Sequence, residues 1–276
     1  MTRVPPTAQE LVDFATEVAR EAGRVTLDWF GRADLDVQRK VDGTPVTEAD
    51  RAAERHVRAR LAERYPHDAV HGEEESDRAG SSGRTWVIDP IDGTKAFSRG
   101  VPLYSNLVAL IDEHGPAVGV INLPALGETV WAGRGLGAFA DGTRCGVSTR
   151  AEFTDAYVCT SEVGYWQHDP TEPHDPLEEL LGSGVELRTW GDAYGYALVA
   201  TGHVEAMVDP IANPWDVAPV AVIIPEAGGR FSSVDGAPDW RAGSGLATNG
   251  VLHDQMLALL NPADPPGSGA FSPAGP

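Results

Sequence analysis

The chain has 276 residues, 42% of them hydrophobic, which is enough to bury a substantial core in one large or two moderate domains. Its 41 acidic and 21 basic residues give a formal charge of −20, which repels nucleic acid phosphates and anionic lipids unless cations intervene, so neither is an expected partner. No uninterrupted apolar run approaches the roughly 18 residues that a membrane-spanning helix needs, and no signal peptide is evident, so we expect a cytoplasmic protein without a membrane anchor.

The first half of the chain is predicted to contain two helices followed by strands. Apolar residues at three- and four-residue steps indicate an amphipathic helix over 8–30. A second helix is predicted to start from Thr47 as its N-cap, with Asp50 three positions later, and to stop before Pro66. The segments 69–75 and 84–90 are predicted strands whose ends carry acids, and 104–112, 117–126 and 128–135 form a predicted β-meander.

The second half is predicted to form another α/β layer. Strands are expected at 156–162, 185–190 and 205–209, and helices at 177–182 and 193–202. The stretch "NPWDVAPVAVIIPEAGG" (213–229) has the Asn-Pro start and Gly-Gly stop of one helix. We therefore divide the chain into an N-terminal subdomain (1–145), a C-terminal subdomain (146–261) and a Pro-, Gly- and Ser-rich tail (262–276) that is predicted to be disordered.

Several acids lie where strands or helices end. A single such acid is usually a solvated strand end or a helix cap. Asp89 and Asp92, however, directly follow the apolar run "WVI", at the carboxyl end of a strand where α/β proteins bind ligands, and Asp216 lies between Trp215 and Val217. These acids therefore predict a shared site.

Carboxylates that meet at one site need cations. Two unit charges about 4 Å apart repel by roughly 4 kcal/mol at an effective dielectric constant near 20. Oxygen ligands without His or Cys nearby favour Mg²⁺, and Mg²⁺ in turn suggests a phosphate substrate. Gly93 and Thr94 would supply backbone amides to that phosphate if a helix begins there.

The segments "GEE", "DPIDGT" and "WDVAPVAVIIPEAGG", in this order and spacing, resemble the inositol monophosphatase superfamily over the chain up to about residue 260. The resemblance implies a Mg²⁺-dependent, lithium-sensitive phosphatase, commonly a homodimer, with a layered αβαβα sandwich fold like that of fructose-1,6-bisphosphatase. It implies two or three Mg²⁺ ions per active site. The implied metal ligands are Glu73, Asp89, the Ile91 carbonyl, Asp92 and Asp216.

The same resemblance assigns the catalytic residues. Asp50 of "TEAD" matches the acid that works with the motif threonine, Thr94, to orient and deprotonate the attacking water, and Glu73 completes the catalytic set. The implied reaction is direct attack of this water on a small-molecule phosphate monoester, without a covalent phosphoenzyme.

The substrate is expected to be L-histidinol phosphate, in histidine biosynthesis. "GDAYGYALVATG", "DPIANPWD" and "DPIDGTKAFSRGVP" resemble the histidinol-phosphate phosphatase branch, whereas inositol enzymes usually have "GTAA" or "GSAA" in place of "GDAY". Asp192 and Asp209 would attract the ammonium and imidazole groups of this substrate. Asp209, however, stands where inositol enzymes carry a hydroxyl-binding acid, and Asp192 is equally interpreted as the N-cap of the helix that begins at Ala193.

Two other functions stay open at this point. One is another phosphatase of the same superfamily, such as an inositol-1-monophosphatase. The other is a non-catalytic, metal-binding relative that has kept the fold, although every matched ligand and Thr94 are present.

Overall fold

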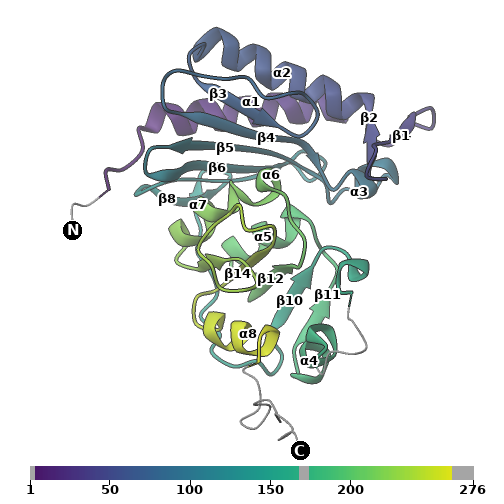
Figure 1. The fold of residues 1–276 in the computed structure, drawn as a ribbon, viewed down its shortest axis with the longest axis vertical. Helices are drawn as coiled ribbons and strands as arrows, with labels where there is room; N and C mark the ends of the chain where they lie inside the picture. Colours follow the sequence, from purple (N-terminus) through teal and green to yellow (C-terminus); the bar gives the residue numbers. More distant parts are fainter. Residues whose placement is uncertain (1–3, 168–173, 263–276) are drawn as a thin grey trace, which may run out of the picture.

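The computed structural model of the protein describes residues 4–167 and 174–262. Its layers alternate in the order helices, sheet, helices, sheet, helices (Figure 1). This is the predicted αβαβα sandwich, and the predicted meander forms the middle of the larger sheet.

The larger sheet has seven strands in the order β3-β4-β5-β6-β7-β8-β9, and only the β3–β4 pair is parallel. Its central strands are buried on both faces because helices cover each side. The strands are β3 (Ala69–Gly72), β4 (Thr85–Asp92), β5 (Ser105–Asp112), β6 (Gly115–Leu123), β7 (Glu128–Gly133), β8 (Gly137–Ala140) and β9 (Thr143–Arg144).

Two helices, α1 (Gln9–Leu27) and α2 (Glu48–Arg64), cover the outer face of the larger sheet (Figure 1). The apolar stripe predicted for the first helix is buried there, between α2 and strands β5 to β7. The Thr47 hydroxyl accepts a hydrogen bond from the first turn of α2, and the Asp50 carboxylate accepts one from the Thr47 amide, so the predicted cap is a full capping box. Before α2, a hairpin of β1 (Val37–Arg39) and β2 (Pro45–Thr47) projects at the side of the molecule.

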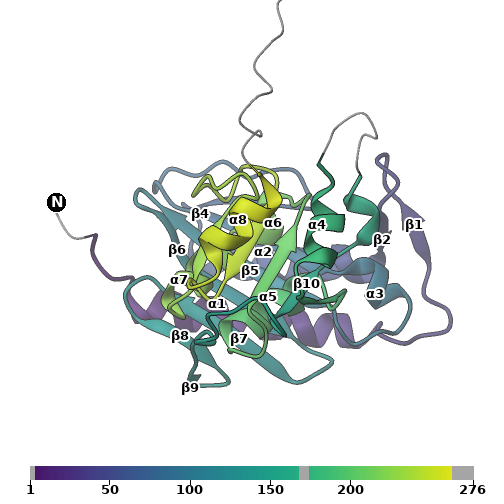
Figure 2. The same cartoon turned by 90° about the horizontal axis from the view of Figure 1, so that it is seen from below.

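The smaller sheet has five strands in the order β11-β10-β12-β14-β13 and lies below the larger sheet in Figure 1. On its far side lie α4 (Pro176–Gly182) and α8 (His253–Leu260), which are nearest the viewer in Figure 2. The strands are β10 (Tyr157–Thr160), β11 (Glu186–Arg188), β12 (Ala206–Asp209), β13 (Arg230–Ser232) and β14 (Gly245–Thr248).

Between the sheets lie α5 (Ala193–Ala200), α6 (Pro214–Val217) and α7 (Val220–Glu226), packed in a core that both sheets share. The expectation of one helix over 213–229 was wrong. Pro219 has no N–H to donate to the preceding turn, so α6 ends at Val217. The Pro219 carbonyl oxygen accepts hydrogen bonds from the Val222 and Ile223 amides, and these bonds form the first turn of α7. Two short elements, α3 (Thr94–Ser98) and the 3₁₀ turn η1 (Val163–Tyr165), lie at the edge of the layers.

In the part of the chain that the structure describes, no helix combines the length and the apolar character needed to cross a bilayer. The division at residue 145 stays a prediction, and the last strand of the larger sheet ends at Arg144. The predicted disordered tail lies outside the described residues except for Pro262.

Candidate active site

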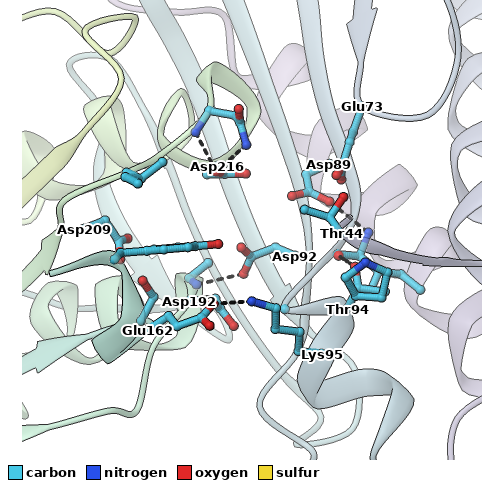
Figure 3. A pocket seen from close by; sticks show the side chains of 18 of the residues that line it. Thr44, Glu73, Asp89, Asp92, Thr94, Lys95, Glu162, Asp192, Asp209 and Asp216 are labelled. Atoms are coloured by element: carbon cyan, nitrogen blue, oxygen red, sulfur yellow. Dashed lines mark hydrogen bonds and ion pairs between the residues drawn. The ribbon is translucent and has the colours of Figure 1, made fainter. Parts of the chain in front are cut away.

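A cavity of about 150 Å³ opens between the two sheets, at the end of β4 (Figure 3). Among the described residues that line it, Lys95 is the single lysine or arginine, whereas carboxylates are numerous. The acids are Glu73, Asp89, Asp92, Glu162, Asp192, Asp209 and Asp216. They come from β4, β12, α6, the residues after β3 and β10 and the residue before α5, so residues far apart in sequence share one strongly anionic pocket.

A bulge at the end of β4 turns both of its aspartates toward this pocket. Asp89 pairs with Leu107 of β5 and Asp92 pairs with Ser105, so β4 has one more residue than its partner over this stretch. In a regular strand residues 89 and 92 would face opposite sides, and the extra residue brings them to the same side. The Asp89 carboxylate also accepts a hydrogen bond from the Ile91 amide at 3.0 Å, which holds the turn.

Three of the predicted metal ligands meet here, because oxygen atoms of Asp89, Asp92 and Asp216 lie within 4.8 Å of one another. Burial raises the pKa values of Asp89 and Asp92 well above their usual range, and neighbouring carboxylates add to both shifts. Burial also raises the pKa of Asp216 to about 7, and the charge of Glu73 contributes. A group of buried and half-buried oxygen ligands that resist ionisation together fits a resident divalent cation such as Mg²⁺.

Glu73 and Ile91, the remaining predicted ligands, line the same cavity. Burial raises the pKa of Glu73, and Lys40 opposes the shift. The Lys40 ammonium, on the β1–β2 hairpin, lies 2.6 Å from carboxylate oxygens of both Glu73 and Glu74. Sequence analysis did not single out Lys40, because its contacts span more than thirty positions of the chain.

Asp50 and Thr94 are brought together as the sequence predicts. The Thr94 hydroxyl lies 3.3 Å from Asp50 Oδ1 and 2.9 Å from the Ile91 carbonyl oxygen, and it can donate a hydrogen bond to either oxygen. Asp50 Oδ2 is already taken by the Thr47 amide and hydroxyl, at 2.8 and 2.6 Å. The side chain of Asp50 is completely buried, and this burial raises its pKa to about 6.

The helix-cap interpretation of Asp192 was wrong. Asp192 directly precedes α5, but its side chain makes no capping hydrogen bond. Instead Asp92 Oδ2 accepts the Ala193 amide at 2.8 Å and the Ser105 hydroxyl at 2.9 Å, so a predicted metal ligand caps α5 from another part of the chain. The Asp192 carboxylate is directed toward Gly93, where a Cβ atom would lie 2.8 Å from Asp192 Oδ2. Gly93 has a φ of +80°, a backbone conformation that favours glycine at this position.

Polar atoms without partners gather on the side of the pocket opposite Glu73. Within the described residues, Ser161 Oγ, the Tyr196 hydroxyl and Asp209 Oδ1 are buried and have no partner in hydrogen-bond geometry. Burial raises the pKa of Asp209 to about 6, although the nearby hydroxyls of Ser161 and Tyr196 oppose the rise. Because unsatisfied buried polar groups are costly, these atoms indicate the place of a polar ligand.

Ser161 and Glu162 were not predicted as site residues. The signal was present, because "TSE" places polar residues at the end of the predicted strand 156–162, as "DP" does at the end of the predicted strand 84–90. Glu162 forms an ion pair with Lys95 across the pocket, and the Lys95 ammonium also lies 5.5 Å from the ring centre of Tyr165. These contacts join α3 to η1 at the edge of the cavity.

Comparison with known proteins gives a consistent result. The model of the inositol monophosphatase family matches residues 7–264. A histidinol-phosphatase of Chlorobaculum parvum is 43% identical to this chain over 90% of the chain and 96% of the relative, and one of Mycobacterium tuberculosis is 42% identical over the same shares. Among solved structures, an IMPase of Thermotoga maritima superimposes with a TM-score of 0.81 at 29% identity, covering 91% of this chain and 97% of that one.

Proposed function

The chain belongs to the inositol monophosphatase family, and we propose that it is a Mg²⁺-dependent histidinol-phosphatase, which converts L-histidinol phosphate and water to L-histidinol and inorganic phosphate. Two histidinol-phosphatases, each more than 40% identical to this chain over nearly all of their length, support the substrate assignment. The chemistry of the pocket supports it independently.

The observation that carries the substrate proposal is the anionic, hydrogen-bonding side of the cavity beyond the metal-binding carboxylates. Asp192 and Asp209 are predicted to bind substrate there, next to the partnerless hydroxyls of Ser161 and Tyr196. Histidinol phosphate carries an ammonium and an imidazole besides its phosphate, so carboxylates on this side favour it over the phosphate of a neutral polyol. An uncharged alcohol would leave these acids without a counter-charge.

The metal site is proposed to hold the phosphate end. Glu73, Asp89, the Ile91 carbonyl, Asp92 and Asp216 would be the ligands, and the amides of Gly93 and Thr94 would donate to the phosphate oxygens. When bound, Mg²⁺ would neutralise the charge of the phosphate and carboxylates and make a water molecule more acidic.

The protein's own residues would then direct the attack. Thr94 would accept a proton from the attacking water through its hydroxyl oxygen and pass its own proton to Asp50 Oδ1. A buried acid with a pKa of about 6 can take up and release such a proton near neutral pH. The water oxygen would bond to phosphorus as the phosphorus–ester oxygen bond breaks. The leaving histidinol oxygen would take up a proton from solvent water, and Asp50 would return the proton it holds to solvent.

Other properties implied by the family belong to the same proposal. They are two or three Mg²⁺ ions per site, inhibition by lithium, a homodimer, a cytoplasmic location and a role in histidine biosynthesis. Gel filtration coupled to light scattering would test the dimer. Titration of the protein with Mg²⁺, after a chelator has removed bound metal, would count the ions in each site.

The decisive experiment measures phosphate release from histidinol phosphate, inositol 1-phosphate and glycerol 2-phosphate at several Mg²⁺ concentrations. We expect the highest kcat/KM for histidinol phosphate, and no turnover in excess chelator. Faster hydrolysis of inositol 1-phosphate would overturn the substrate and leave the metal chemistry standing. If none of the three esters is hydrolysed, the alternative of a non-catalytic relative gains support.

A further inference from the structure

Glu54, on α2, is a completely buried acid that does not touch the cavity. Its carboxylate accepts hydrogen bonds from the Glu74 amide at 2.8 Å and the Glu75 amide at 3.2 Å. It also pairs with Arg58, one turn later on the same helix, through a 2.7 Å contact to Arg58 Nε. A buried carboxylate is costly unless it is paired and hydrogen-bonded, and here its partners are Arg58 and the backbone that follows Glu73.

The residue before Glu73 is held against the same carboxylate. A Cβ atom on Gly72 would lie 2.2 Å from Glu54 Oε1, so only glycine lets β3 end in contact with α2 at this point. Arg58 Nη2 meanwhile donates to the Glu75 carbonyl oxygen at 2.9 Å. The backbone is thus fixed on both sides of Glu73, by contacts that do not use the Glu73 side chain.

These contacts and the water-activating acid come from one face of one helix. Asp50, Glu54 and Arg58 follow one another at four-residue steps, which places them in a single row along α2. Asp50 lies at the Thr94 end of this row, and Glu54 and Arg58 lie beside the turn that carries Glu73. The relative position of Glu73 and Asp50 is therefore set by α2.

We propose that Glu54 is a positioning residue for the metal site: by holding the backbone of Gly72–Glu75, it directs the Glu73 carboxylate toward Asp89 before Mg²⁺ binds. The inference rests on the proposed Mg²⁺ site. Groups that orient metal ligands typically change metal affinity by roughly 10- to 100-fold when they are replaced. Glu54 acts on the ligand, not on the substrate.

The test is Glu54→Gln, with Glu63→Gln, at an exposed position of the same helix, as the matched control. The glutamine has the size of the glutamate, but its NH₂ group would face a backbone N–H or Arg58 instead of accepting from it. We expect the Mg²⁺ dissociation constant from calorimetry, and the Mg²⁺ concentration for half-maximal activity, to rise by roughly tenfold or more. At saturating Mg²⁺, kcat should stay within about threefold of wild type, because Asp50 and Thr94 are unchanged.

A double-mutant cycle separates positioning from general support of the fold. If Glu54 acts through Glu73, then adding Glu54→Gln to Glu73→Gln should weaken Mg²⁺ binding no further. The inference is overturned if Glu54→Gln weakens Mg²⁺ binding equally in the wild-type and Glu73→Gln backgrounds. It is also overturned if the Mg²⁺ dissociation constant of Glu54→Gln equals that of the Glu63→Gln control. If Glu54→Gln does not fold, Arg58→Lys takes its place, because it keeps a positive charge near Glu54 but loses the contact to the Glu75 carbonyl oxygen. We expect Arg58→Lys to weaken Mg²⁺ binding as well. An Mg²⁺ dissociation constant equal to that of wild type would refute the inference.

The wild-type protein distinguishes this inference from the function on which it rests. If wild type binds no Mg²⁺ by calorimetry, the proposed function itself fails. If wild type binds Mg²⁺ and hydrolyses a phosphate ester while Glu54→Gln behaves like the control, only the role of Glu54 is wrong.

Discussion

Replacing Asp216 by Asn is expected to stabilise the metal-free protein while it abolishes turnover. Asp216 shares its site with Asp89 and Asp92, whose oxygens lie within 4.8 Å of its own. Its Oδ2 atom also accepts the Asn213 amide at 2.7 Å, in the capping box of α6. Asparagine keeps one oxygen to accept this bond, so the substitution removes a charge and leaves the cap.

The size and sign of the gain follow from the pKa of Asp216. Burial and the charge of Glu73 raise it from 3.8 to about 7, so ionised Asp216 destabilises the folded protein relative to the unfolded chain. The penalty is absent below about pH 4, grows as the pH rises to about 7, and stays constant above that value. About three pKa units correspond to roughly 4 kcal/mol, an upper limit because the neighbouring carboxylates share the protons of the site.

Urea unfolding in the presence of EDTA, at pH 4 and pH 8, measures this effect for wild type and Asp216→Asn. Asp235→Asn, at an exposed position, is the control for loss of one charge. We expect Asp216→Asn to raise the free energy of unfolding at pH 8 by on the order of 2–4 kcal/mol and to change it little at pH 4. Added Mg²⁺ should stabilise wild type much more than the variant. Equal or lower stability of the variant at pH 8, or a gain that persists at pH 4, would refute the reasoning.

Three further predictions concern single side chains. Thr94→Ala and Asp50→Asn should each lower kcat by roughly 10²- to 10⁴-fold with little change in substrate affinity. Rapid-quench kinetics of the wild-type protein should show no burst, and a trapped phosphoenzyme would contradict direct attack by water. Asp192→Asn should lower kcat/KM for histidinol phosphate by about ten- to hundredfold and leave kcat/KM for glycerol 2-phosphate nearly unchanged. The melting temperature should not fall, because the Asp192 side chain caps no helix. Equal losses of kcat/KM on both esters would exclude a role of Asp192 in selectivity. His253 is fully buried between the hydroxyls of Ser232 and Thr248, and burial and Arg230 lower its pKa to about 4. As the pH falls from 6.5 to 4, the free energy of unfolding of wild type should therefore decrease by up to about 1.4 kcal/mol per pH unit relative to that of His253→Gln. Parallel pH profiles of the two proteins would contradict this.

Much of the fold could be predicted because its signals are local. The apolar stripe of α1, the Thr47–Asp50 capping box and the apolar runs of the meander strands each depend on residues a few positions apart. The prediction of one helix over 213–229 was wrong for a local reason too, because Pro219 has no N–H and interrupts the helix between its strong start and stop signals.

The sequence by itself determined which chemical groups the site contains. The residue pattern places Asp89 and Asp92 at the end of a buried strand, with a turn at Gly93 after them. Hard oxygen ligands at a strand end were enough to predict a divalent cation and a phosphate. These conclusions need only residue types and short spacings.

Only the tertiary structure decided how those groups are arranged. Asp216 meets Asp89 because α6 packs between the sheets, Asp92 rather than Asp192 caps α5, and Glu54 holds the backbone beside Glu73. Each of these contacts joins segments that no short-range pattern links. The physical reason is that a carboxylate's partners are set within a few tenths of an ångström by the packing of whole layers, whereas hydrophobic periodicity specifies only which face of each element is buried.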